Sequence, residues 1–167
     1  MNERLIESEE CLKEGSGYLA DRFPEFSYAI DMIGSLNLRR QPDGFSQLLS
    51  AIVSQQLSVA AANSIWSRLK LARLIGPRKI SSASDEELAA AGLSRQKIRY
   101  ARALADSKIN YRKLRGMAND EVIAELTQVS GIGSWTAEIY TMFSLGRADV
   151  FAPGDLALQE SARLLFD

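Results

Sequence analysis

The sequence predicts an all-α domain, and three observations support this prediction. Apolar residues recur at helical spacing along most of the chain, no segment alternates apolar and polar residues as a half-buried strand would, and serines stand where helices need N-caps. With 167 residues, of which 46% are hydrophobic and 25% charged, the chain can bury a core without metals or disulfides. We therefore expect residues 1–167 to form a single helical domain.

The predicted helices follow each other closely, separated by glycine- and proline-containing turns. The first is amphipathic and is interrupted by Gly15 and Gly17. The predicted helices span about residues 3–22, 26–33, 43–53, 58–74, 84–91, a basic segment after 94, 120–128, 135–145 and 156 to the end. The side chains predicted to cap them are Ser58, Ser84 (with Glu87 in a capping box), Ser94, Asn119 and Ser134.

Basic residues are concentrated in one part of a chain whose net charge is −1. Residues 95–115 include Asp106 as their one acid, against these bases: Arg95, Lys97, Arg99, Arg102, Lys108, Arg112, Lys113 and Arg115. This pattern fits either a solvated helix face or a local patch that faces phosphates.

Cysteine and histidine usage excludes several classes of site. Cys11 is the one cysteine and there is no histidine, so a disulfide framework, a four-cysteine zinc or iron–sulfur site and a histidine triad are all excluded within this chain. The N-terminus lacks the order of a signal peptide, and no 18-residue apolar run occurs. We expect an intracellular protein without membrane contact, in the cytoplasm or nucleoid of a bacterium or the nucleus of a eukaryote.

The most informative segment joins two predicted helices through Gly131, Ile132 and Gly133. Glycines let a backbone turn tightly and approach a ligand, and the amides here, with the next helix N-terminus, predict a phosphate site. Carbonyls on the other side of such a turn can hold a monovalent cation. The alternative is an ordinary glycine-rich connection between helices.

Three motifs in order give the chain a family resemblance. They are Gly131-Ile132-Gly133-Ser134-Trp135-Thr136-Ala137-Glu138, the segment Val150-Phe151-Ala152-Pro153-Gly154-Asp155, and the upstream segment 45–58. Over about residues 40–167 the chain resembles the helix-hairpin-helix DNA glycosylase superfamily, in particular its 3-methyladenine DNA glycosylase II branch. The resemblance implies the glycosylase fold, with its hairpin at about residues 120–145.

The resemblance also implies an activity. The implied activity is that of a monofunctional DNA glycosylase, which hydrolyses the N-glycosidic bond of an alkylated base of the 3-methyladenine type. The base is flipped out of duplex DNA for this reaction, which is the first step of base excision repair. Members of this branch usually continue for several more helices, so we expect a C-terminally truncated chain that lacks the last helices of the fold. The expected partner is damaged double-stranded DNA, bound by a monomer.

The catalytic candidate is Asp155, because a carboxylate near the sugar stabilises the oxocarbenium character that develops as the bond breaks. The alternative is a helix N-cap, and both roles are compatible. Trp135 stands where lyase-competent relatives carry a lysine, so no Schiff base and no lyase activity are expected. Its indole can stack on an electron-poor base, or it can simply be core. Ile139, one turn later, is expected in the base pocket.

The remaining candidates contact the DNA. The turn between the third and fourth helices offers Gln55, Gln56 or Leu57 to fill the space of the extruded nucleotide, unless it is merely a polar turn. By position, the amides of Gly131, Gly133 and Thr136 would bind phosphate. The carbonyls of Thr127, Val129 and Ile132 would hold Na⁺ or K⁺. No cofactor is expected to be required.

Three alternatives compete with this function. A non-catalytic helix-hairpin-helix DNA-binding module would explain the glycines and the basic helix but not Asp155 or Trp135. A mismatch or other-lesion glycosylase of the same superfamily is less compatible with one cysteine, because those relatives often carry an iron–sulfur cluster. A helical interaction domain unrelated to nucleic acid is the last alternative.

Overall fold

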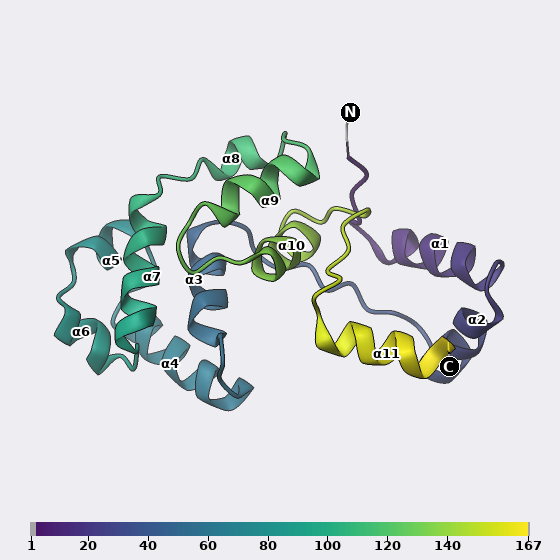
Figure 1. The fold of residues 1–167 in the computed structure, drawn as a ribbon, viewed down its shortest axis with the longest axis horizontal. Coiled ribbons are helices and arrows are strands. Elements are labelled where there is room, and N and C mark those ends of the chain that lie inside the picture. Colours follow the sequence, from purple (N-terminus) through teal and green to yellow (C-terminus); the bar gives the residue numbers. More distant parts are fainter. Residues whose placement is uncertain (1–2, 167) are drawn as a thin grey trace.

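Helices make up almost all the regular structure of residues 3–166, the part of the chain that the computed structural model describes (Figure 1). In this range, the β-type pairing is one isolated bridge between Leu5 and Arg147. The all-α prediction is therefore confirmed. The helices are α1 (Glu9–Ala20), α2 (Pro24–Ile33), α3 (Phe45–Ser54), α4 (Val59–Leu71), α5 (Pro77–Ser82), α6 (Asp85–Ala90), α7 (Arg95–Asp106), α8 (Tyr111–Leu114), α9 (Asn119–Thr127), α10 (Ser134–Phe143) and α11 (Leu156–Phe166).

The helices fall into two groups with α10 between them (Figure 1). The group from α3 to α9, together with α10, contains the core, in which Leu48, Ile52, Leu104 and Leu126 are almost fully buried. By contrast, α1, α2 and α11 contribute no residue that is fully buried. The hairpin between α9 and α10 thus rests on the densely packed group, where positions are held most rigidly.

Three of the predicted helix caps are confirmed. The hydroxyl groups of Ser58, Ser84 and Ser94 each accept a hydrogen bond from the amide three residues further on, at the starts of α4, α6 and α7. At α6 the Glu87 carboxylate also accepts from the Ser84 amide at 2.7 Å, which completes the capping box. These are local patterns, so the sequence alone was enough to place them.

Two predicted caps are wrong. Asn119 and Ser134 are the first helical residues of α9 and α10, and the N-cap positions are occupied by Ala118 and Gly133. At α9 the Glu121 carboxylate accepts from the Ala118 amide at 3.0 Å instead. At α10 the glycine provides no side chain, so no cap side chain covers the amides at the start of this helix.

The prediction of a first helix over residues 3–22 is also wrong at its start, because α1 begins at Glu9. The preceding residues are extended and pair with the segment after α10: the Ile6 amide donates to Gly146 at 2.7 Å, and the Ala148 amide donates to Arg4 at 2.9 Å. The two glycines predicted to interrupt this helix lie inside it. A contact across the whole chain therefore outweighs the local amphipathic pattern.

Part of the basic segment has a structural role. The Arg102 guanidinium donates to the Ala83 carbonyl at 2.9 Å and pairs with Asp85, so it joins α7 to the start of α6. The Lys97 amine donates to the Val53 carbonyl in the last turn of α3. The charge run is therefore only partly a free basic face.

Across residues 3–166, none of the helices has the length and apolar character that a membrane span requires.

Candidate active site

Asp155, directly before α11, is in direct contact with Trp135, which lies in the first turn of α10. The indole nitrogen of Trp135 donates a hydrogen bond to one Asp155 carboxylate oxygen at 2.8 Å. The other oxygen accepts from the amides of Ala157 and Leu158 at 2.9 and 3.0 Å, at the first turn of α11. Asp155 is therefore a helix cap, as one of its two expected roles required, and it still faces the indole.

The surroundings keep the Asp155 carboxylate ionised. The Trp135 hydrogen bond, the Leu158 amide and the Ala157 amide lower the pKa of this carboxyl below its usual range, and burial opposes them only in part. Trp135 itself keeps 44% of its surface exposed, so it is not simply a core residue. A fixed negative charge of this kind can stabilise an oxocarbenium ion as it develops.

The two glycines of the hairpin have different environments. Gly131 has φ +95°, and a Cβ placed on it would lie 2.3 Å from Cγ of Tyr100 on α7. Gly133 has φ −88°, and nothing lies within 4 Å of its Cβ position. The first glycine is therefore required by the backbone conformation and by packing, whereas the second leaves its face open to a ligand. Thr136, one turn into α10, is buried.

The carbonyls expected to hold a cation lie at the C-terminal end of α9 and in the turn that follows. Among the described residues, no backbone amide outside the helices donates to the carbonyl of Thr127 or Ile132, while the Val129 carbonyl accepts from the Ile132 amide at 3.0 Å. The Thr127 hydroxyl donates back into α9, to the Ile123 carbonyl at 2.9 Å. Carbonyl oxygens without an amide partner fit a monovalent cation, and no group of acidic, cysteine or histidine ligands for a metal occurs in residues 3–166.

The turn between α3 and α4 presents its three candidates differently. The half-buried Gln55 donates from its side-chain amide to the Gly131 carbonyl at 2.8 Å. Gln56 is exposed and has φ +56°, a conformation that costs a non-glycine residue on the order of 1–3 kcal/mol. Leu57 is 40% exposed. Of the three, Gln56 and Leu57 project from the turn.

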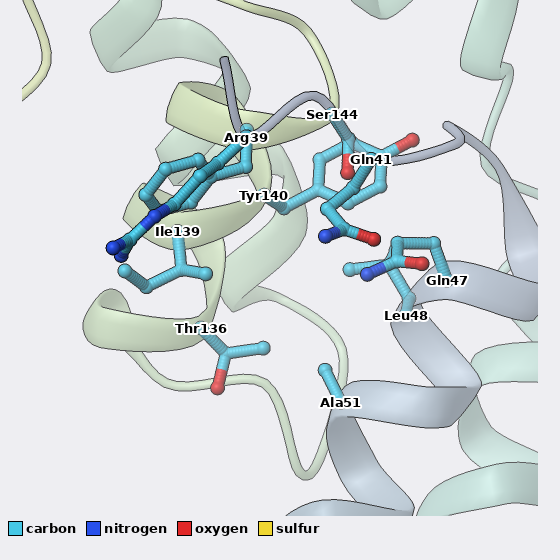
Figure 2. Close-up of a pocket in the computed structure, with 10 residues that line it drawn as sticks. Arg39, Gln41, Gln47, Leu48, Ala51, Thr136, Ile139, Tyr140 and Ser144 are labelled. Atoms are coloured by element: carbon cyan, nitrogen blue, oxygen red, sulfur yellow. The ribbon is translucent and has the colours of Figure 1, made fainter. Parts of the chain in front are cut away.

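A cavity of about 350 Å³ lies between α3 and α10 (Figure 2). Ile139, predicted in the base pocket, lines it; Trp135, four residues earlier on the same helix face, does not. None of its lining residues is an acid. The lining is Arg39, Gln41, Gln47, Leu48, Ala51, Thr136, Ile139, Tyr140, Phe143 and Ser144.

Arg39, Gln41 and Gln47 were not predicted from the sequence as site residues. Figure 2 shows the amide groups of Gln41 and Gln47 close to each other on one side of the cavity, with Arg39 on the other. Arg39 and Gln41 belong to the segment before α3, which reaches α10 only through tertiary contacts. In one of these contacts the backbone amide of Gln41 donates to the Phe143 carbonyl at 2.9 Å. No local sequence signal indicates such a contact.

Tyr140 fixes this segment to α10. Its hydroxyl accepts a hydrogen bond from the Gly44 amide at 2.8 Å, directly before α3. Burial raises the pKa of Tyr140 to about 12, so the phenol stays neutral at physiological pH. The wall of the cavity therefore does not change its charge under ordinary conditions.

The helical architecture, the glycine hairpin and the carboxylate that follows it identify the class of protein. The chain belongs to the HhH-GPD superfamily of base excision DNA repair proteins, whose family model matches residues 49–166. The match includes the turn between α3 and α4, the hairpin and Asp155.

Particular relatives within this superfamily are similar over much of the chain. DNA-3-methyladenine glycosylase 1 of Schizosaccharomyces pombe is 32% identical over 148 residues, which are 81% of this chain and 65% of the relative, so this chain spans slightly less than two thirds of its length. The crystal structure of a DNA-3-methyladenine glycosidase from Bacillus halodurans matches 99% of this chain and 77% of its own, with a TM-score of 0.81 and 36% identity. The Schizosaccharomyces pombe 3-methyladenine DNA glycosylase in complex with abasic DNA matches 91% of this chain and 80% of its own, with a TM-score of 0.81 and 29% identity.

Proposed function

We propose that this chain is a monofunctional DNA glycosylase that hydrolyses the N-glycosidic bond of alkylated bases flipped out of duplex DNA. The observation that carries the proposal is the ionised Asp155 carboxylate, held by the Trp135 indole at the start of α11. The similarity to 3-methyladenine glycosylases, one of them in complex with abasic DNA, supports both the substrate class and double-stranded DNA as the partner. The chain would act as a monomer wherever the cell keeps its DNA.

Asp155 acts mainly through its charge. As the glycosidic bond breaks, positive charge develops on the sugar, and a preorganised carboxylate stabilises it without reorganisation. The hydrogen bonds that lower the pKa of Asp155 also make it a weaker base. It therefore orients the attacking water rather than fully deprotonating it before the bond breaks.

The base would occupy the space beside Trp135 and Ile139. The indole face supplies stacking for an electron-poor or cationic base, worth about 0.5–2 kcal/mol. The adjoining cavity provides no carboxylic acid to protonate the departing base. This favours bases that alkylation has already made good leaving groups. With Trp135 where a Schiff-base lysine would be needed, the strand is left uncut.

The DNA backbone would bind at the hairpin and the turn. The open face of Gly133, with the amides of Gly131 and Thr136, would receive a phosphate at the α10 N-terminus. The carbonyls of Thr127, Val129 and Ile132 would hold Na⁺ or K⁺, which adds positive charge beside that phosphate.

The turn between α3 and α4 would fill the gap in the duplex. Gln56 and Leu57 project from it and would take the place of the flipped nucleotide.

The experiment is to incubate the chain with duplex DNA treated with a methylating agent and to analyse both the free bases and the strand. The proposal predicts release of 3-methyladenine, with abasic sites that break only after alkali. Salt-sensitive DNA binding without base release would contradict it and would indicate a DNA-binding module instead.

A further inference from the structure

The insertion turn, residues 54–58, is attached to the hairpin by one side chain. Gln55 caps the end of α3, and its amide group crosses to donate to the Gly131 carbonyl at 2.8 Å. The two residues are 76 positions apart in the sequence, and the bond is half-buried. It joins the part of the chain proposed to fill the duplex to the part proposed to hold the phosphate.

Gly131 is itself held from the other side. Its backbone packs against the ring of Tyr100 on α7, so closely that a Cβ could not be accommodated. The Tyr100 hydroxyl in turn accepts from the Gln96 amide group at 2.6 Å. The carbonyl that receives the Gln55 hydrogen bond therefore belongs to a peptide with little freedom to move.

A second bond from α7 fixes the start of the turn. Lys97 donates to the Val53 carbonyl in the last turn of α3, and partial burial lowers the pKa of its amine. The end of α3 is thus attached to α7 directly and to the hairpin through Gln55. Immediately after these two attachments, Gln56 takes a left-handed backbone conformation, which persists only where the surroundings determine it.

We propose that Gln55 is a positioning residue that keeps the insertion turn preformed relative to the phosphate site, so that Gln56 and Leu57, and not Gln55, enter the duplex. This inference rests on the proposed function for the step that it assists. Binding of a phosphate at the hairpin then places the turn at a fixed distance along the DNA, and insertion needs no separate ordering of the turn. Loss of the Gln55 bond would leave phosphate binding intact and would slow nucleotide flipping.

The test uses Gln55→Met and Gln55→Leu, two uncharged variants that both remove the donor and keep an apolar side chain in its place. The matched control is Gln128→Met, because Gln128 is an exposed glutamine directly after α9 whose side chain donates back to the Ala124 carbonyl at 3.3 Å. Each protein is assayed for affinity to undamaged duplex, for single-turnover base release and for the fluorescence of 2-aminopurine placed beside the lesion, which reports unstacking.

Both Gln55 variants should bind undamaged duplex within twofold of wild type. Their single-turnover rate and the 2-aminopurine signal should fall about three- to tenfold, the effect of one hydrogen bond. The Gln128 control should match wild type. Unchanged rates in both Gln55 variants would overturn the inference. An equal loss of affinity and rate together with a lower melting temperature would also overturn it, since Gln55 would then only stabilise the fold.

The outcome can be separated from that of the proposed function. If wild type releases no base but the Gln55 variants still show a weaker 2-aminopurine response at unchanged affinity, the glycosylase proposal fails and the positioning role stands. If wild type releases base and the Gln55 variants release it equally fast, the glycosylase proposal stands and the positioning role of Gln55 fails.

Discussion

Substituting the two hairpin glycines by alanine should have very different effects on stability. In Gly131→Ala the new methyl group would need a backbone at φ +95° and would overlap the Tyr100 ring. The left-handed conformation costs an L-residue roughly 1–2 kcal/mol, and displacing a packed ring adds about 1–3 kcal/mol. The total of about 2–5 kcal/mol is a large part of the stability of a typical domain.

Gly133→Ala is the matched control for folding. Its φ of −88° suits any residue, and nothing lies near the Cβ position. Replacing glycine where the backbone allows it gains about 0.4–1 kcal/mol, because the unfolded chain loses freedom. Gly133 is the N-cap of α10, where alanine is less favourable than glycine, so the two effects oppose each other and the free energy of unfolding should change by less than about 1 kcal/mol. The same methyl group would stand where the phosphate approaches, so DNA affinity should fall about tenfold, equivalent to ~1.4 kcal/mol.

The assay is thermal and urea unfolding of both variants, followed by DNA titration at several salt concentrations. For a chain of this size, the loss in Gly131→Ala corresponds to a melting temperature lower by about 4–20 °C. Adding Tyr100→Ala to that variant should recover about 1 kcal/mol relative to the sum of the single changes. Equal stability of the two glycine variants, or the absence of any coupling with Tyr100, would refute this account of the hairpin.

Three further predictions concern the site. Trp135→Phe removes the hydrogen bond that most lowers the pKa of Asp155, so the pKa of this carboxyl should rise. The loss of activity on acidification should therefore begin at a higher pH than in wild type. An unshifted acidic limb in the pH–rate profile would count against the contact. Tyr140→Phe leaves the Gly44 amide without its partner and should lower the free energy of unfolding by about 1–2 kcal/mol in urea titrations, whereas a neutral effect would mean that this bond does not hold the segment. Gln56→Ala should slow single-turnover base release about tenfold. The melting temperature should stay the same or rise, because alanine has less side chain to order. A lower melting temperature with normal base release would show a structural role instead.

The elements that sequence could predict are those fixed by neighbours in the chain. The caps at Ser58 and Ser84, the basic helix after Ser94 and the hairpin glycines all follow from residues a few positions apart. The family assignment is confirmed for the same reason, since its motifs are short and lie in order. The contact between Trp135 and Asp155 was not predicted, because the two residues are 20 positions apart.

What the sequence could not predict depends on contacts between distant segments. Residues 3–8 match an amphipathic helix locally but pair with the segment after α10, which competes successfully for their backbone groups. Arg39 and Gln41 line the cavity because a tyrosine on α10 holds their segment in place. The short helices α5 and α8 were not predicted, because one or two turns give too little periodicity to detect.

The most direct test of the central claim is the single-turnover release of 3-methyladenine from duplex DNA by wild type and Asp155→Asn. The control is Asp149→Asn, which removes an exposed carboxylate from the same linker. The account predicts that wild type and the control release the base, and that Asp155→Asn is slower by about 10²–10³-fold with unchanged DNA affinity. A rate for Asp155→Asn within a few-fold of wild type would contradict the assignment of Asp155 as the catalytic carboxylate.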